Sequence, residues 1–200
     1  MDIRKLSIIC AAVAGLGGCY TPVPDPSVST QDAKYLSMVP NFETELNFHR
    51  YQMDDPTGEV PGTVVVDSRQ HYLYFVLPGK KVIRYGVATG SEAQGWSGVA
   101  TIQRKAEWPR WMPPLDMLER WPHLKPTYDA GGLPGGPDNP LGARAMYLYQ
   151  NNKDTLYRIH GTNEPETIGH DVSSGCIRMA NIDAIDLFNR VQVGAKVIVK

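Results

Sequence analysis

Consecutive alternating segments between Thr63 and Gly90 constrain the fold more than any other feature. The segments TVVVD, HYLYFVLP and KVIRYGVATG follow one another, separated by Ser68-Arg69-Gln70 and by Pro78-Gly79. Runs of this length, rich in Val, Ile and Tyr and bounded by turn residues, are typical of β-strands joined by tight reversals. Both alternating faces of HYLYFVL are largely apolar, which predicts a central strand of a packed sheet.

Further strands are expected downstream, with few helices. The segment GVATIQRKAE (98–107) alternates Val99, Thr101 and Gln103 against Ala100, Ile102 and Arg104. A strand pair is predicted for 145–150 and 155–161 around the turn 151–154, and KVIVK closes the chain. Asn181 is a plausible N-cap for a helix that runs to about Val191. With Gly 19 and Pro 16, these patterns predict a mainly β fold, a β-sandwich or mixed sheet with one or two short helices.

The segment from Trp108 to Leu141 interrupts this pattern with three tryptophans, many prolines and several glycines. Its stretch PPLDMLERW predicts a short helix that begins near Pro113 or Pro114. A long irregular segment in a compact domain usually has a function. We expect a lid or substrate wall, or an insertion whose aromatic residues cover the core; the two are compatible.

The N-terminus predicts export. A charged start, an apolar run from Leu6 to Leu16 and small residues have the layout of a secretory signal over residues 1–18. Leu16-Gly17-Gly18-Cys19 resembles the lipobox of bacterial lipoproteins, which implies a lipidated Cys19 and a membrane anchor on the periplasmic side of the envelope; ordinary cleavage with an incidental Cys19 is the alternative. Residues 19–61, rich in Pro, Ser, Thr and Asp, are expected to form a tether, with 35–38 as a stretch that could dock.

Charge and cysteine content limit the possible functions. Lys+Arg 20 against Asp+Glu 21 gives a net charge of −1, and no basic cluster alternates with aromatic residues, so a nucleic-acid partner is not expected. Beyond the first twenty residues, Cys176 is the only cysteine. An unpaired thiol in an exported protein suggests reactivity, although a buried cysteine can simply act as a small hydrophobic residue.

Two side chains in the stretch YRIHGTNEPETIGHDVSSGCIRM suggest acyl transfer. His160 follows an apolar strand-like run, and Cys176 lies 16 positions later. A histidine can accept the proton of a cysteine or hold it as an imidazolium–thiolate pair. Gly175 permits close approach of a substrate carbonyl to backbone N–H groups that could serve as an oxyanion hole. Arg178 is suited to binding a carboxylate.

The segments HGTNEPETIG and SSGCIRM resemble the signature of the L,D-transpeptidase (YkuD-type) catalytic domain, and the likeness extends over residues 62–200. It implies that Cys176 attacks the carbonyl between the third and fourth residues of a peptidoglycan stem peptide, releases D-alanine and forms a thioester. His160 then corresponds to the general base. The positions expected to shape the pocket or bind substrate are Gly161, Thr162, Ser173, Ser174, Gly175 and Arg178. Many members carry histidine where this chain has Ser174, so the contact that orients His160 is expected to be a backbone carbonyl.

The resemblance implies peptidoglycan stem peptides as partners and no cofactor, and it leaves the acyl acceptor open. The acceptor is a diaminopimelate amine of another stem, giving a 3→3 crosslink, an amine of an envelope protein, or water, giving an L,D-carboxypeptidase. Three other hypotheses are weaker. A zinc site of His160, His170 and Cys176 has unsuitable spacing, and papain-like or NlpC-type peptidases place cysteine before histidine. The third is a non-catalytic, lipid-anchored wall-binding module, in which Cys176 is idle.

Overall fold

The computed structural model describes residues 20–90, 96–172 and 175–200. The predicted signal segment 1–18, Cys19, Ser173 and Ser174 lie outside the described residues. Within the described ranges, no helix has the length and apolar character needed to cross a membrane.

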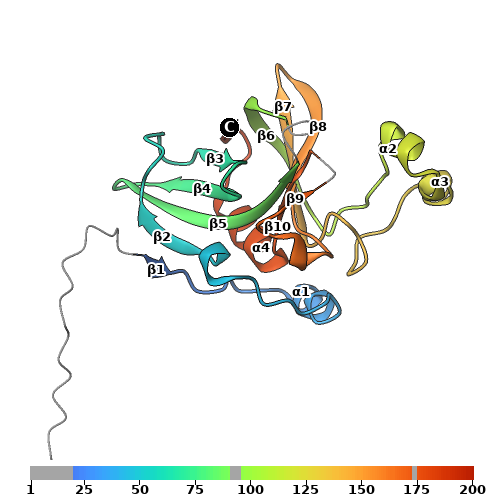
Figure 1. The fold of residues 1–200 in the computed structure, drawn as a ribbon, viewed down its shortest axis with the longest axis horizontal. Coiled ribbons are helices and arrows are strands. Elements are labelled where there is room, and N and C mark those ends of the chain that lie inside the picture. The colour runs from blue at the N-terminus through green and yellow to red at the C-terminus, as the bar shows by residue number, and fades with distance from the viewer. Residues whose placement is uncertain (1–19, 91–95, 173–174) are drawn as a thin grey trace, which may run out of the picture.

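Two antiparallel meanders form most of the sheet (Figure 1). The first joins β3 (Val64–Asp67), β4 (Tyr72–Leu77) and β5 (Lys81–Gly90), which confirms the expected succession of strands. The second joins β6 (Gly98–Glu107), β7 (Arg144–Gln150) and β8 (Lys153–His160). Asn151 and Asn152 have positive φ in the turn between β7 and β8, the conformation that two-residue hairpin turns require.

Two strands connect the meanders and close the sheet. β10 (Ile177–Met179) is antiparallel to β5 and parallel to β8. β11 (Lys196–Val199) lies between β6 and β3. The order β5-β10-β8-β7-β6-β11-β3-β4 returns to β5 through the β4–β5 pairing. The prediction of a mainly β mixed sheet is confirmed, and the sheet is closed. The sequence did not reveal β10 or β9 (Asp171–Val172), because strands this short show no period.

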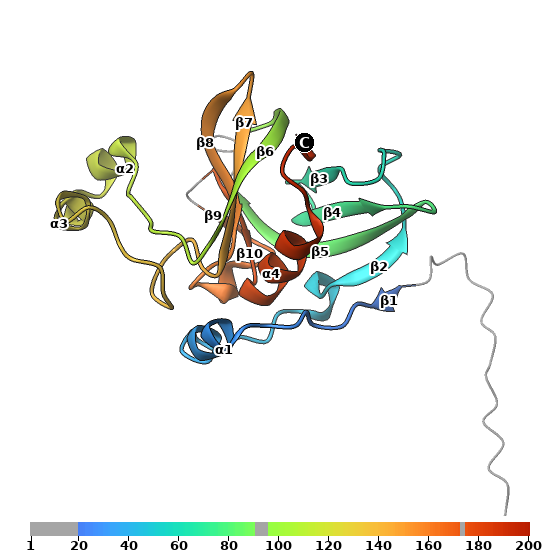
Figure 2. The same cartoon turned by 180° about the vertical axis from the view of Figure 1, so that it is seen from behind.

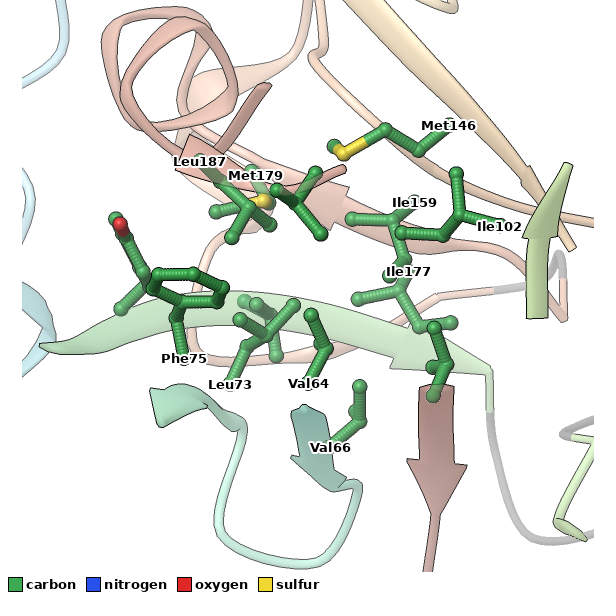
Figure 3. Packing of buried hydrophobic residues seen from close by; sticks show 14 of the residues in the cluster. Val64, Val66, Leu73, Phe75, Ile102, Met146, Ile159, Ile177, Met179 and Leu187 are labelled. Atoms are coloured by element: carbon green, nitrogen blue, oxygen red, sulfur yellow. The ribbon is translucent and has the colours of Figure 1, made fainter. Parts of the chain in front are cut away.

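The core fills the interior of this closed sheet (Figure 3). It combines side chains from both meanders with Ile177 and Met179 of β10 and Leu187 of α4 (Asn181–Arg190). The helix α4 confirms the predicted C-terminal helix, but its N-cap is Ala180, not Asn181. A bulge between Ile102 and Arg104 also corrects the predicted alternation of β6. Ile102 is in the core, whereas Arg104 lies on the opposite face of the sheet.

Residues 20–60 are packed on the domain, which corrects the prediction of a tether. We call them the N-terminal arm: it contains β1 (Thr21–Pro22), α1 (Thr30–Leu36), the 3₁₀ turn η1 (Leu46–Phe48) and β2 (Tyr51–Asp54), and β2 pairs with β5. Buried Asp32 accepts hydrogen bonds from Trp108 Nε1 (2.8 Å) and from both Nη atoms of Arg144 (2.8 and 2.9 Å). Arg50 forms an ion pair with Asp183 of α4. A few buried charges hold the arm, and they create no periodicity.

Residues 108–141 form an insertion that projects from the domain, with α2 and α3 farthest from the sheet in both views (Figures 1 and 2). It contains α2 (Leu115–Arg120), which confirms the predicted short helix, as well as the 3₁₀ turn η2 (Pro122–Leu124) and α3 (Lys125–Asp129). None of these three elements has a buried residue. The neck of the insertion is fixed by the Trp111–Leu133 bridge and by buried Asn139, whose Nδ2 donates to the Pro109 carbonyl (2.9 Å).

Candidate active site

The parallel pair β8–β10 brings the two predicted catalytic residues to one face of the sheet. Ile159 pairs with Ile177, and both side chains point into the core. Because side chains alternate along a strand, His160 lies on the opposite face, and so does Cys176 when the register is extended to this residue directly before β10. Neighbouring strands are about 4.8 Å apart and alternate residues about 6.6 Å apart, so these two side chains are diagonal neighbours. The structure therefore juxtaposes residues that are 16 positions apart in the sequence.

Backbone carbonyls orient the His160 ring. His160 is buried at the end of β8, and its Nδ1 lies 2.5 Å from the Gly161 carbonyl oxygen. Since a carbonyl oxygen can only accept, this contact requires the proton on Nδ1, and in the neutral ring Nε2 is then the nitrogen that carries none. This matches the expectation of a backbone carbonyl as the orienting group. Burial lowers the pKa of His160 to about 4, which outweighs the opposing effect of the Gly161 and Pro140 carbonyls. The ring is therefore neutral at neutral pH.

Cys176 is half-buried at the start of β10 and lines a cavity of about 560 Å³. Burial raises the pKa of its thiol, while a hydrogen bond from the Arg158 backbone and the charges of Arg158 and Arg178 act in the opposite direction. The resting state is therefore a neutral thiol beside a neutral imidazole. Gly175 lies in the bend before Cys176, and the predicted pocket residues Ser173 and Ser174 lie outside the described residues.

The insertion forms one wall of this cavity, as the sequence suggested. Trp111, Pro113 and Leu115 contribute apolar surface, and Tyr128 of α3 also contributes. The strands β6 to β8 contribute four residues that sequence reasoning missed, namely Arg104, Tyr147, Leu156 and Arg158. Their proximity to Cys176 depends on the strand register and on the bulge in β6, neither of which has a sequence signature.

Arg178, predicted to bind a carboxylate, pairs with His160 across β8 and β10. It is not among the residues that line the Cys176 cavity. Its Nη1 forms an ion pair with Glu164 Oε2 at 2.5 Å. The Arg178 guanidinium is therefore paired with the carboxylate of Glu164. Its positive charge lowers the pKa values of both His160 and Cys176.

Gly161 and Thr162 are both buried, which corrects their expected role in contacting substrate. Asn181 holds this segment: its Oδ1 accepts from the N–H groups of Ala143 (2.8 Å) and Thr162 (3.1 Å), and its Nδ2 donates to the Thr162 carbonyl (2.7 Å). A Cβ atom at position 161 would lie only 2.1 Å from Asn181 Oδ1, so only glycine fits there. These residues support the backbone around His160.

The described residues contain no cluster of three His, Cys, Asp or Glu side chains that could hold a metal ion. His170 is exposed on the surface. The arrangement around Cys176 is that of a nucleophile, a neutral base and a cationic cavity, the combination used in acyl transfer through a thioester.

Residues 61–199 match the model of the YkuD L,D-transpeptidase catalytic domain, and the chain belongs to this family. It is 36% identical over 151 residues to the putative L,D-transpeptidase YqjB of Bacillus subtilis, covering 72% of this chain and 76% of that protein. It is 34% identical over 137 residues to the probable L,D-transpeptidase ErfK/SrfK of Escherichia coli, covering 67% of this chain. The chain spans 42% of the length of that relative.

Solved structures support the fold. An L,D-transpeptidase from Xylanimonas cellulosilytica has a TM-score of 0.51 over 73% of this chain and 63% of that chain; at 16% identity, this likeness concerns the fold alone. A Brucella melitensis structure named as a probable carnitine operon oxidoreductase is 45% identical, covers 84% of this chain and 99% of that chain, and has a TM-score of 0.52. A shared fold does not by itself transfer a reaction, and the matched family concerns transpeptidation.

Proposed function

We propose that this chain is a peptidoglycan L,D-transpeptidase in which Cys176 is the nucleophile and His160 is the general base. The observation that carries the proposal is the diagonal placement of these side chains on one face of β8 and β10, with Cys176 open to a 560 Å³ cavity. Family membership supplies the substrate class, stem peptides of peptidoglycan.

The two pKa shifts favour general-base catalysis over a preformed ion pair. With its pKa lowered to about 4, His160 is ready to accept a proton at neutral pH. The raised pKa of Cys176 keeps its proton on sulfur until substrate arrives. Proton transfer to Nε2 then accompanies the attack of sulfur on the carbonyl.

Two steps complete the reaction. In the first, a C–S bond forms at the carbonyl of the third stem residue, the C–N bond to D-alanine breaks, and the departing amine takes the proton from His160. In the second, the acceptor amine gives a proton to His160 and attacks the thioester. An amide bond forms, the C–S bond breaks, and the proton returns to the Cys176 sulfur.

The acceptor in this proposal is an amine, either of a second stem or of an envelope protein. Water in its place would make the chain an L,D-carboxypeptidase of the same fold. We also propose export to the periplasmic side of the envelope with Cys19 as the lipidated residue, supported by the sequence Leu16-Gly17-Gly18-Cys19 after an apolar run. Incorporation of labelled palmitate by the wild type but not by Cys19→Ser would test the anchor; equal incorporation would exclude it.

Incubation with disaccharide-tetrapeptide, followed by mass analysis of the products, tests the reaction. The wild type is expected to give crosslinked dimers and free D-alanine. Cys176→Ala should abolish both products, and His160→Ala should lower the rate by about 10²–10⁴-fold. Trimmed monomers alone would assign the carboxypeptidase activity. Full activity in either variant would contradict the proposed mechanism.

The non-catalytic wall-binding module predicts a different result. A reactive thiol in this cavity should be acylated by a carbapenem, by analogy with the family, and intact-protein mass would show one adduct that Cys176→Ala lacks. The absence of an adduct on a folded wild-type protein would favour the binding module.

A further inference from the structure

A row of side chains crosses four neighbouring strands and ends at the nucleophile. Arg104 of β6 pairs with Tyr147 of β7, and Tyr147 pairs with Arg158 of β8. Cys176, one residue before β10, continues the row: extending the β8–β10 register by one residue places it beside Arg158, whose backbone N–H donates a hydrogen bond to its sulfur. The row spans three strand spacings, roughly 14 Å, about the length of four extended residues. It forms the floor of the cavity that Cys176 lines.

Positive charge is concentrated in this row. The Arg104 guanidinium lies 3.7 Å from the Tyr147 ring centroid and the Arg158 guanidinium lies 4.4 Å from it, so both cations make cation–π contacts with the same ring. Asp154 neutralises Arg158 through two hydrogen bonds of 2.7 and 2.9 Å. Across the described ranges, the side chain of Arg104 has no carboxylate partner and makes no hydrogen bond. Its charge is therefore uncompensated and faces the cavity.

Arg110 adds a second uncompensated cation from the neck of the insertion. Its Nη1 donates to the carbonyls of Gly131 (3.1 Å) and Gly132 (2.9 Å), which fixes the side chain but leaves its charge unpaired by any described carboxylate. The single acidic residue lining the cavity, Asp116, already pairs with Arg120. With Arg158 paired to Asp154 and Asp116 paired to Arg120, Arg104 and Arg110 leave the cavity with a net positive charge.

We propose that Arg104 and Arg110 form a carboxylate-binding subsite that selects acyl donors with free side carboxylates over donors in which these groups are amidated. This inference rests on the proposed function and specifies its substrate. A guanidinium binds a carboxylate through two parallel hydrogen bonds, which a neutral amide cannot reproduce with the same charge complementarity. A carboxylate placed here also supplies the counter-ion that Arg104 and Arg110 lack among the described residues.

Calorimetry on Cys176→Ala protein tests the subsite independently of turnover. The probes are disaccharide-tetrapeptide with free side carboxylates and the same molecule with those carboxylates amidated. The free-acid donor is expected to bind about tenfold more tightly or better, the effect typical of a hydrogen bond to a charged group. Adding Arg104→Gln or Arg110→Gln should remove most of this preference, and Arg104→Lys should retain part of it.

Lys125→Gln provides the matched control, because Lys125 is an exposed cation of the same insertion that does not line the cavity and pairs with Asp129, which does not line it either. It should leave the preference unchanged. Equal weakening of both donors by Arg104→Gln and Arg110→Gln would show a structural role and overturn the proposal. An unchanged preference would overturn it as well. Failure of the wild type to form crosslinks would instead count against the proposed function, since this binding needs no chemistry.

Discussion

The N-terminal arm and the insertion look alike in sequence but differ in how they are attached. Both are long, rich in proline and without sustained periodicity. The arm adds β2 to the sheet and places Asp32 and Arg50 in buried ion pairs with the body. Among the described residues, the insertion is hydrogen-bonded to the rest of the chain only near its two ends, through bonds such as those of Trp108 and Asp138, and α2 and α3 bury no residue. The arm is therefore part of the folded unit, whereas the insertion serves as a wall of the cavity.

This difference shows that the attachment of an irregular segment depends on a few buried partners. Burial by itself raises the pKa of the Asp32 carboxyl, but hydrogen bonds from Arg144 and Trp108 outweigh it and hold that pKa below its usual range. These contacts join α1 to the start of β7, directly before the strand pair that carries His160. The arm thus stabilises β7, the strand that pairs with the His160 strand β8.

The largest expected difference comes from breaking the anchor of the arm. Asp32→Ala leaves the buried Arg144 guanidinium with only the longer ion-pair contact to exposed Glu107 (3.7 Å), which should lower the free energy of unfolding by about 3–5 kcal/mol. Urea unfolding would measure this loss. A change below about 1 kcal/mol would show that the arm is not part of the folded unit.

On acidification, the stability contribution of His160 in the body of the domain should be lost at a higher pH than that of Asp32 in the N-terminal arm. His160 has a lowered pKa in the folded state, so at this site the unfolded chain binds more protons between about pH 6.5 and 4, and the His160 contribution to stability falls by about 3 kcal/mol over that range. The raised pKa of Asp183 acts in the opposite direction, so the comparison with His160→Gln isolates the histidine. His160→Gln should flatten this slope. The lowered pKa of Asp32 means that the contribution of the arm persists above its ordinary value of 3.8 and is lost only below it. An unchanged slope in His160→Gln would contradict the assigned shift.

Trimming the insertion should have a small effect on stability and a larger one on catalysis. Replacing residues 114–130 with a short Gly-Ser linker removes no buried side chain of α2, η2 or α3. The free energy of unfolding should change by less than about 1 kcal/mol, while kcat/KM for the tetrapeptide donor falls about tenfold or more because one wall of the cavity is lost. A stability loss as large as that of Asp32→Ala would remove the distinction between the two segments.

The smallest effect is expected from the exposed counterpart of the Asp32 anchor. Asp116→Asn breaks the i,i+4 pair with Arg120 on α2, and surface pairs of this kind contribute about 0.3–0.5 kcal/mol. Thermal and urea unfolding should both remain near the wild type. A loss comparable to that of a buried pair would mean that α2 packs on the domain.

Regular features of the molecule could be predicted from the sequence, and long-range ones could not. Alternation located β3 to β8 and β11, and the two motifs located His160 and Cys176. The closure of the sheet by β10 depends on a three-residue strand. The bulge that turns Arg104 toward the cavity, the Asp32–Arg144 pair and the support of the His160 segment by Asn181 all join residues far apart in the chain. Such contacts depend on how the strands and the arm pack together, which local sequence patterns do not record.

The most direct test of the central claim is intact-protein mass after brief exposure to tetrapeptide donor. The account predicts a wild-type adduct equal to the donor minus D-alanine, mapped by proteolysis to Cys176 and discharged on addition of an amine acceptor. Cys176→Ala should carry no adduct and release no D-alanine. Release of D-alanine by Cys176→Ala at the wild-type rate would contradict the account.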